Sequence, residues 1–345
     1  MMNNIDLIRF LRTHPCVSGF EELCGKKELS AILPDANNWK EDKNGNLFYL
    51  KKGKDSSKTL MIEAHRDTIG LCVKEHLGDS FYSVSACGGF DASILPGTLL
   101  KIITTGNNPV SAIAASKPPH VLSEEDRKKK AAISDIYVDT GIFQASVKVG
   151  DPVIFAAKTE DMANDRVVSP GLDNAVGVIS LLSALQQIDE PCYDVLFLLS
   201  SSEETLSRGV ISFMKDRNIH AAIILDAGFH RDRGLDETKC IIMGKGPSIS
   251  ITDTLDADMT RFVENTAKKH GIPLQIICEP GGTGTSATQI QLQSNGTPSA
   301  VISIPICNMH TPSEIAKLSD IDETAKLIVS LCKEDGLPSK EVFIS

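Results

Sequence analysis

The segment Thr59-Leu60-Met61-Ile62-Glu63-Ala64-His65 indicates the fold class. It is short and mostly apolar, as expected for a strand that is buried on both faces of a parallel sheet. The run ends at His65, so the chain leaves this predicted strand at an ionisable side chain. Parallel strands need crossover connections, which are usually helices, so further strands of this kind should alternate with helical patterns.

Beyond Asp165 the sequence shows this alternation. The predicted strands cover residues 194–200, 221–225, 274–278 and 300–304, and the predicted helices cover residues 173–188, 205–215, 257–270, 286–294 and 321–332. Strands that alternate with helices form an open α/β sheet. We therefore predict one α/β domain built from residues 1–66 and 160–345.

The N-terminal segment carries two further signals. Ser18-Gly19-Phe20-Glu21 has the Ser-x-x-Glu form of a capping box, which predicts a helix from there to about Ile32. Asn44-Gly45 predicts a hairpin turn between two short strands.

Residues 67–159 have a different pattern. Short β-type runs cover residues 69–73, 81–85, 99–104, 110–115, 136–138 and 153–156, and Gly and Pro separate them. One charged helix is predicted at roughly Ser123–Ala132, with its acids early and its bases late. Several short strands at regular spacing favour a small β-barrel or sandwich, so we predict a β-rich domain inserted into the α/β domain.

Composition sets aside two classes of partner. The 345 residues carry a net charge of −10, so the chain lacks the basic surface of a nucleic-acid binder and has no charge attraction to anionic lipid. The N-terminus lacks the pattern of a secretory signal, and no apolar run reaches the length of a membrane span. Nine cysteines without a CxxC pair are typical of free thiols in a reducing compartment, so we expect a cytoplasmic protein.

Acids and histidines follow nearly every predicted strand of the α/β domain. They are His65 and Asp67 after the first strand, Glu203 and Glu204 after strand 194–200, Asp226 after strand 221–225, His310 after strand 300–304, and Asp173 at the start of a helix. Ligand sites of open α/β sheets lie beyond the carboxyl ends of the strands. Imidazole and carboxylate groups are suitable ligands for zinc, cobalt or manganese, and one carboxylate can bridge two such ions.

Residue spacing suggests different roles for some of these side chains. Residues two apart on a strand face the same way, so Asp67 can hold the ring of His65 in the tautomer that binds a metal. Glu203 and Glu204 are adjacent and cannot point the same way, so one can bind a metal while the other moves protons. Each residue also has an ordinary structural interpretation. Asp173 fits a helix cap, and the glutamate pair fits the positive end of a helix dipole.

The same residues lie in a set of motifs that resembles the M42 family of metallo-aminopeptidases, the glutamyl and deblocking aminopeptidases, some of which carry the label endoglucanase M. The matching stretches are Ala64-His65-Arg66-Asp67-Thr68-Ile69-Gly70, Ser116-Lys117-Pro118-Pro119-His120, Pro170-Gly171-Leu172-Asp173-Asn174, Ser202-Glu203-Glu204 with Arg208-Gly209, Leu225-Asp226, Gly244-Lys245-Gly246-Pro247, and Met309-His310-Thr311-Pro312 with Glu314. The resemblance runs from about His65 to Leu327. It implies a zinc-peptidase-like α/β domain with an open mixed sheet and an inserted β-rich domain.

The resemblance also implies a role for each site residue. Asp173 would bridge two divalent metal ions, with His65 and Asp226 completing one site and Glu204 and His310 completing the other. Glu203 would be the general base and acid, and Asp67 would orient His65. A water between the metals would attack the first peptide carbonyl, and Glu203 would carry its proton to the leaving amine.

The chain departs from the family pattern at two positions. Asn174 stands where the family usually has a second Asp after the bridging one, and Gly284 stands where it often has an Asp. The loop that contains Gly282, Thr283 and Gly284 is predicted to line the substrate pocket. Its missing carboxylate affects recognition of the substrate amine and the choice of first residue, while every predicted metal ligand is kept.

Partners and alternatives complete the prediction. The resemblance implies short peptides as substrates and a homo-oligomer, up to a dodecameric shell, assembled through the inserted domain at residues 67–159. Two other functions stay open at this stage. One is a glycoside hydrolase of the endoglucanase type, which would use a carboxylate pair and no metal. The other is a homologue that binds metal and peptide but has lost catalysis, for which only Asn174 and Gly284 argue.

Overall fold

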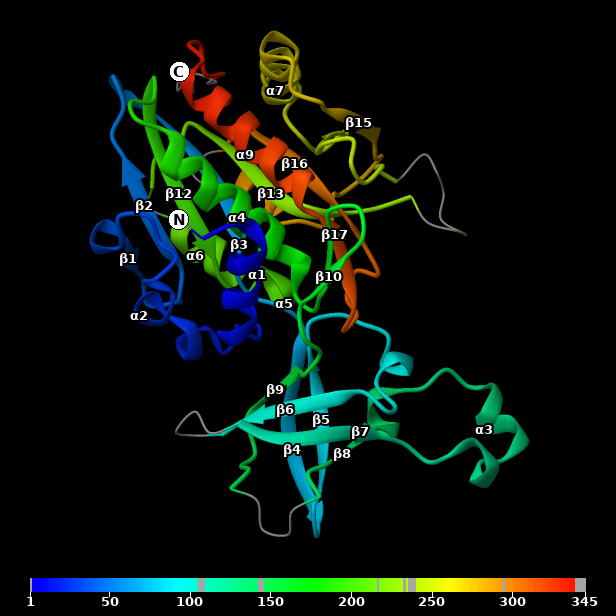
Figure 1. Cartoon of the computed structure of the whole chain (residues 1–345). Coiled ribbons are helices and arrows are strands. Elements are labelled where there is room, and N and C mark those ends of the chain that lie inside the picture. Colours follow the sequence, from blue (N-terminus) through cyan, green and yellow to red (C-terminus); the bar gives the residue numbers. More distant parts are fainter. Residues whose placement is uncertain are drawn as a thin grey trace.

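Four parallel strands form the centre of the main sheet, in the spatial order β12 (Tyr193–Ser200), β3 (Asp55–His65), β13 (Ala221–Phe229) and β16 (Ser299–Cys307) (Figure 1). This computed structural model describes residues 2–104, 109–141, 146–215, 217–231, 234, 240–293 and 296–338. Because the four strands run the same way, their carboxyl ends meet at one edge of the sheet.

Antiparallel strands extend the sheet on both sides, so it is mixed. On the β12 side lie β2 (Leu47–Lys51) and β1 (Lys40–Glu41), joined by the predicted hairpin turn at Asn44-Gly45. On the β16 side lie β17 (Glu314–Lys317), β11 (Arg166–Ser169) and β10 (Glu160–Met162), while β14 (Ser248–Ile251) pairs with both β16 and β15 (Gln275–Cys278). The predicted open, mixed α/β sheet is confirmed.

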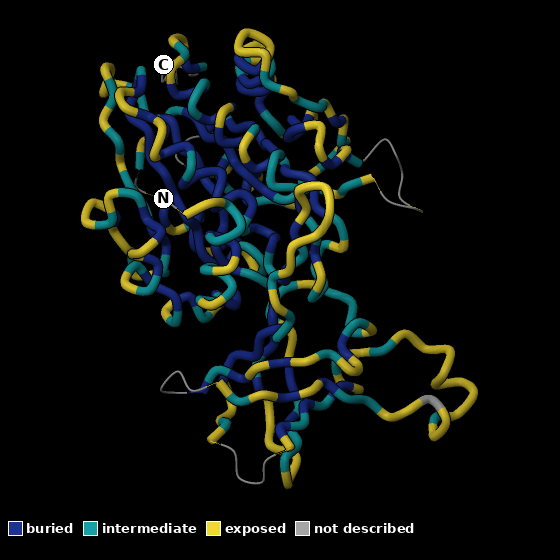
Figure 2. Tube along the Cα trace, viewed as in Figure 1, coloured by how far each residue is buried: buried dark blue, intermediate teal, exposed yellow. Residues whose placement is uncertain are grey.

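Helices cover both faces of the sheet. One face packs against α1 (Asn4–Thr13), α4 (Leu172–Gln187) and α9 (Leu318–Lys333), with α7 (Ala257–His270) beside α9, and the other packs against α6 (Arg208–Met214) and α8 (Ala287–Gln291). Leu60 and Ile62 enter the first core cluster and Met61 enters the second, because successive strand residues face opposite ways. Figure 2 shows the resulting buried centre. No helix in the described ranges is long and apolar enough to cross a membrane.

Glu63 is the polar member of the buried run in β3. Its carboxylate accepts hydrogen bonds from Ser200 and, at 2.7 Å, from the hydroxyl of Ser286. Burial raises the pKa of Glu63 to about 7. The two hydroxyl donors replace the water that this carboxyl group loses on folding.

The inserted segment forms a closed six-stranded barrel. In spatial order its strands are β4 (Gly70–Gly78), β5 (Phe81–Cys87), β8 (Tyr137–Asp139), β7 (Pro109–Ala115), β6 (Leu99–Ile103) and β9 (Pro152–Phe155). Inward residues such as Leu71, Val84, Leu100 and Val153 make a separate apolar core. The charged helix, α3 (Glu124–Lys128), lies on an arm between β7 and β8 that projects away from the barrel (Figure 1). The predicted β-rich insertion is confirmed as a barrel.

Two local predictions are wrong. The capping box at Ser18 does not form. A 3-10 turn (Glu21–Cys24) and a short α2 (Lys26–Leu29) replace the predicted helix, because Gly25 between them is extended and the Glu21 carboxylate binds the N–H of Gly19 and the hydroxyl of Ser202.

The predicted helix 205–215 is divided into α5 (Glu203–Leu206) and α6, because Ser207 adopts a left-handed conformation with φ of 52°. A different predicted helix, at residues 286–294, corresponds to α8, and its predicted last residue, Ser294, lies outside the described residues.

Candidate dinuclear metal site

The carboxyl edge of the sheet gathers the predicted site residues. His65 ends β3, Asp226 lies near the end of β13, and Glu203 and Glu204 begin α5 directly after β12. His310 lies in the loop after β16, and Asp173 lies at the start of α4, which follows the antiparallel strand β11. Residues separated by up to 245 positions in the chain are therefore brought to one place by the parallel order of the strands.

His65, Asp173 and Asp226 form the first triad of potential metal ligands. All three are buried, and their ligand atoms lie within 4.8 Å of one another. His65 Nε2 lies 3.2 Å from Asp173 Oδ1 and 3.4 Å from Asp226 Oδ1. This is a compact set of one imidazole and two carboxylates.

Asp173, Glu204 and His310 form the second triad within the same 4.8 Å limit. His310 Nε2 lies 3.3 Å from Asp173 Oδ2 and 3.4 Å from Glu204 Oε2. Asp173 therefore turns Oδ1 toward the first triad and Oδ2 toward the second. A carboxylate in this position can bridge two ions, which is the role that the family resemblance implies for Asp173.

The donor chemistry fits divalent metal ions. The Nδ1 atom of His65 lies 3.0 Å from the main-chain oxygen of Asp67, so the ring can donate there and present its other nitrogen to the two carboxylates. Glu204 Oε1 is buried and accepts no hydrogen bond from the residues that the structure describes. The buried Asp173 Oδ1 faces His65 Nε2 at 3.2 Å, an ion-pair contact without hydrogen-bond geometry. Buried carboxylate oxygens without donors are stabilised by a cation, and this mixed set suits zinc, cobalt or manganese.

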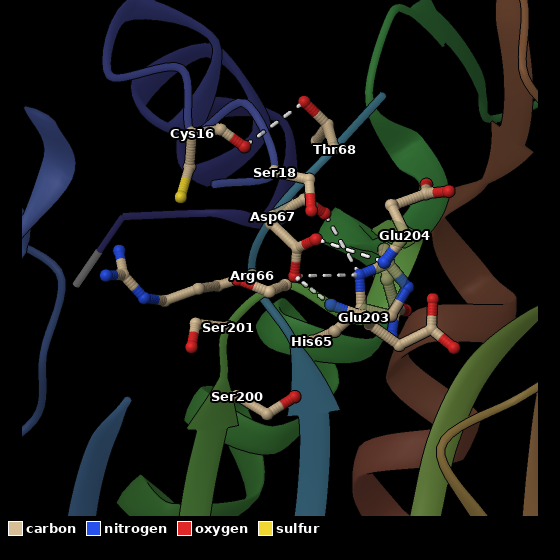
Figure 3. Close-up of polar contacts among 12 residues, drawn as sticks. Cys16, Ser18, His65, Arg66, Asp67, Thr68, Ser200, Ser201, Glu203 and Glu204 are labelled. Atoms are coloured by element: carbon tan, nitrogen blue, oxygen red, sulfur yellow. Dashed lines mark hydrogen bonds and ion pairs between the residues drawn. The ribbon is translucent and has the colours of Figure 1, made fainter. Parts of the chain in front are cut away.

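The carboxylate of Asp67 has a different contact from the predicted one. The main-chain oxygen of Asp67 contacts the His65 ring, whereas Asp67 Oδ1 lies 3.8 Å from His65 Nδ1. Its two carboxylate oxygens accept the main-chain N–H groups of Glu203 at 3.0 Å and Glu204 at 3.2 Å. Figure 3 shows the dashed contacts that join Asp67 to the histidine and to the glutamate pair. One residue thus positions parts of both triads and Glu203.

Glu203 belongs to neither triad, but it lines the cavity that opens in front of both of them. Burial and the negative charges of Asp226 and Glu204 raise its pKa to about 9, against the opposing effect of His65. A carboxyl group with a raised pKa beside a metal site is a candidate acid and base.

The histidine rings carry the positive charge of this site in the metal-free chain. Ion pairs with Asp173 and Glu204 raise the pKa of His310 to about 11. Burial lowers the pKa of His65, but its contacts with Asp173 and Asp226 outweigh this and hold it well above its usual range. In the metal-free chain the protons on these two rings supply positive charge at the positions where bound divalent cations would supply it.

Glu314 was part of a sequence motif, but its role was not predicted. This buried residue of β17 accepts the main-chain N–H of Asp173 at 3.1 Å and that of His310 at 2.8 Å. Burial and the charge of Asp173 raise its pKa to about 8. Glu314 therefore connects the shared ligand to a ligand of the second triad, and its only sequence signal was its position four residues after His310.

Asn174 caps the helical part of α4. Its Oδ1 accepts the N–H of Gly177 at 3.0 Å, and its Nδ2 donates to the main-chain oxygen of Leu225 at 2.7 Å. The cap is thus Asn174 and not Asp173, whose side chain faces the two histidines. An amide suits this position because it both accepts and donates.

A cavity of about 440 Å³ opens in front of the two triads. Thr283 and Gly284 of the predicted substrate loop line it, while Gly282 is not among its lining residues. Phe229, Ile277 and Met309 add apolar surface. The volume of the cavity lies within the range of about 300–1,000 Å³ that is typical of small-molecule sites.

Comparison with known proteins identifies the family. Residues 45–327 match the M42 glutamyl aminopeptidase family. A lysyl aminopeptidase from Pyrococcus furiosus is 32% identical over 343 residues, which cover 95% of this chain and 96% of that protein.

Solved structures agree with this. A TET aminopeptidase from a marine sediment archaeon of the Thaumarchaeota has a TM-score of 0.87 at 26% identity, covering 97% of this chain and 98% of that one. The TET1 peptidase of Pyrococcus horikoshii has a TM-score of 0.84 at 25% identity, and the match covers 96% of this chain and 100% of that one. The chain belongs to the M42 family and is an aminopeptidase.

Proposed function

We propose that this protein is a two-metal aminopeptidase that removes the N-terminal residue from short peptides. The observation that carries the proposal is the position of Asp173, whose two oxygens face two separate ligand triads. Glu203 lines the cavity and belongs to neither triad, so its carboxylate is free to move protons.

Five side chains would hold the metals. One ion would bind His65, Asp226 and Asp173, and the other would bind Glu204, His310 and Asp173. When bound, the ions would activate a water and stabilise the negative charge that develops on the peptide carbonyl. We propose zinc as the metal, with cobalt or manganese as alternatives that the same ligands accept.

Glu203 would accept the proton of the attacking water and deliver it to the leaving amine. Its pKa of about 9 in the metal-free chain would fall beside two cations, which would leave it ionised and able to act as a base at neutral pH. Asp67 would hold Glu203 in place through the main-chain N–H that it accepts. The main-chain oxygen of Asp67 would fix the tautomer of His65.

Glu203→Gln tests this assignment. The variant should lose at least ~100-fold in kcat, because a positioned acid–base group contributes about 10²–10⁴-fold. It should retain both metal ions, because Glu203 is not a ligand. Glu190→Gln, an exposed glutamate paired with Lys54, is the matched control. Near-normal turnover by Glu203→Gln with full metal content would overturn the role of Glu203.

Chelation tests the endoglucanase alternative. Removal of the metal should abolish peptide hydrolysis, and full activity on a glucan after chelation would favour a glycosidase that needs only carboxylates. Tight peptide binding without hydrolysis in the metal-loaded protein would instead favour a homologue that has lost catalysis.

We also propose that the inserted domain, residues 67–159, mediates assembly into a homo-oligomer, up to a dodecamer. The Pyrococcus horikoshii TET1 peptidase is described as assembling into a tetrahedron or a large octahedral shell. The barrel of this chain exposes Leu77, Leu99 and Val149 by 53%, 63% and 68%, and an interface through the barrel would cover such side chains. Native mass spectrometry of the wild type and of Leu99→Glu tests it.

The cysteines bear on the cellular compartment. None of the nine, all of which lie in the described ranges, takes part in a disulfide. We propose a cytoplasmic location, because free thiols persist in a reducing compartment.

A further inference from the structure

A further carboxylate, Glu279, lines the cavity on the wall formed by β14 and β15. It belongs to neither metal triad and has no part in the proton transfers described above. We propose that Glu279 selects peptides whose first residue has a cationic side chain, lysine or arginine. This inference rests on the proposed function, because it assigns the substrate class of the same site.

The position of Glu279 is set by the sheet. It follows β15 directly, and its main-chain N–H donates to the oxygen of Ile251 at 3.0 Å. The hydroxyl of Ser250, a buried residue of β14, donates to Glu279 Oε2 at 3.1 Å. The other oxygen, Oε1, accepts no hydrogen bond from the residues that the structure describes. One oxygen is therefore held by the protein and the other is available to a ligand.

The charge of the cavity favours a cation at this place. No lysine or arginine is among the described residues that line the cavity, and its two histidines lie in the metal triads. Glu279, which is only partly exposed, therefore has no positive partner there. An ammonium or guanidinium group would form a charge-assisted hydrogen bond with it, whereas a second carboxylate would be repelled.

The shape of the cavity fits a long side chain. Phe229, Ile277 and Met309 provide apolar surface for the methylene stem of lysine or arginine, which packs on such surface while its charged end stays polar. Gly284 adds no side chain to this space, and a Cβ built there would meet no atom within 4 Å. The loop thus leaves room in the cavity, and Glu279 supplies the acidic group.

The competing role for Glu279 is recognition of the peptide α-amine, which every substrate shares. The two roles predict different kinetics. A side-chain role affects lysine and arginine substrates selectively, whereas an α-amine role affects all substrates equally.

The test compares kcat/KM for matched aminoacyl chromogenic substrates with Lys, Arg, Leu and Glu as first residue. The metal-loaded, assembled wild type should cleave Lys and Arg at least ~10-fold better than Leu, and Glu worst, because a charge-assisted hydrogen bond is strong in a partly desolvated site. Glu279→Gln should lower the Lys-to-Leu ratio by about 10- to 100-fold. Glu190→Gln, remote from the cavity, should leave the ratio unchanged.

Two results would overturn the inference. One is a wild type that does not prefer Lys over Leu, and the other is an equal loss of Lys and Leu activity in Glu279→Gln, which would assign the residue to the α-amine. If the wild type cleaves no substrate with any metal, the proposed function fails by itself. Calorimetric binding of lysinamide and leucinamide then decides the role of Glu279. Tighter binding of lysinamide that disappears in Glu279→Gln supports the inference, and equal binding overturns it.

Discussion

Glu314→Gln is expected to weaken metal binding without removing any metal ligand. Glu314 accepts the main-chain N–H of Asp173 with one oxygen and that of His310 with the other. Glutamine has the same shape but only one oxygen, so its NH₂ group must face one of these N–H donors. One buried hydrogen bond is then lost and two donors are opposed, which costs about 1–3 kcal/mol.

The two N–H groups belong to the metal ligands Asp173 and His310, so losing one of these hydrogen bonds should lower the affinity for metal. Partners that hold ligands in place typically contribute 10- to 100-fold in metal affinity, and we expect a reduction in that range. A cost of about 2 kcal/mol in the free energy of unfolding corresponds to a fall of roughly 3 °C in Tm for a chain of this length. The measurement should be made near pH 9, because the pKa of Glu314 is about 8 and its carboxylate is then ionised.

Asp320→Asn is the matched control. Asp320 is also buried and accepts two main-chain N–H groups, from Gly244 at 2.7 Å and Gly246 at 2.9 Å, but it does not line the metal cavity. Calorimetric metal titration and thermal unfolding should show a similar loss of stability in both variants and a loss of metal affinity only in Glu314→Gln. Metal affinity within twofold of the wild type in Glu314→Gln would refute the reasoning.

Three further predictions follow from the same site. Asp67→Asn opposes an amide NH₂ to the N–H of either Glu203 or Glu204 and so displaces the glutamate pair. The kcat should fall at least ~10-fold, which is less than the ~100-fold or more expected when the acid–base group itself is removed, and single-turnover kinetics should place the loss in the chemical step. Asn174→Asp puts an acceptor against the carbonyl oxygen of Leu225 and should cost about 1–3 kcal/mol in denaturant unfolding; an unchanged midpoint would contradict this. Metal affinity should rise with pH, and metal binding should release protons. The pKa of His310 is raised to about 11, so its proton must leave before a metal binds. Calorimetry in buffers of different ionisation enthalpy measures the number of protons released. In the metal-free protein the same group stabilises the fold fully below about pH 6.5, its unfolded pKa, and this contribution decreases as the pH rises toward 11.

The strands of the α/β domain could be predicted because burial on both faces leaves a continuous apolar run that few other structures produce. The site residues could be predicted because each follows or ends such a run, as His65 does for β3 and Glu203 and Glu204 do for β12. Local signals were less reliable. The capping box at Ser18 failed because Glu21 binds Ser202, a residue 181 positions away, which no local pattern reports.

The supporting contacts could not be predicted for the same reason. Which atoms of Asp67 contact His65 and which contact the glutamate pair depends on how the end of β3 meets the start of α5. The clamp formed by Glu314 depends on the antiparallel pairing of β17 with β11, which brings it beside the segment before α4. The position of Glu279 depends on the pairing of β14 with β15.

The order of strands and helices, the inserted β-rich segment, and the acids and histidines at the strand ends could be inferred from the chain alone. Hydrophobic periodicity and residue chemistry are local properties, which is why they suffice for these features. The folded arrangement was needed to show that one carboxylate, Asp173, faces two triads, that Asn174 is a cap, and that Glu279 has no positively charged partner among the described residues that line the cavity. These features depend on distances between residues far apart in the chain. The register of parallel strands sets those distances, and a sequence pattern does not contain that register.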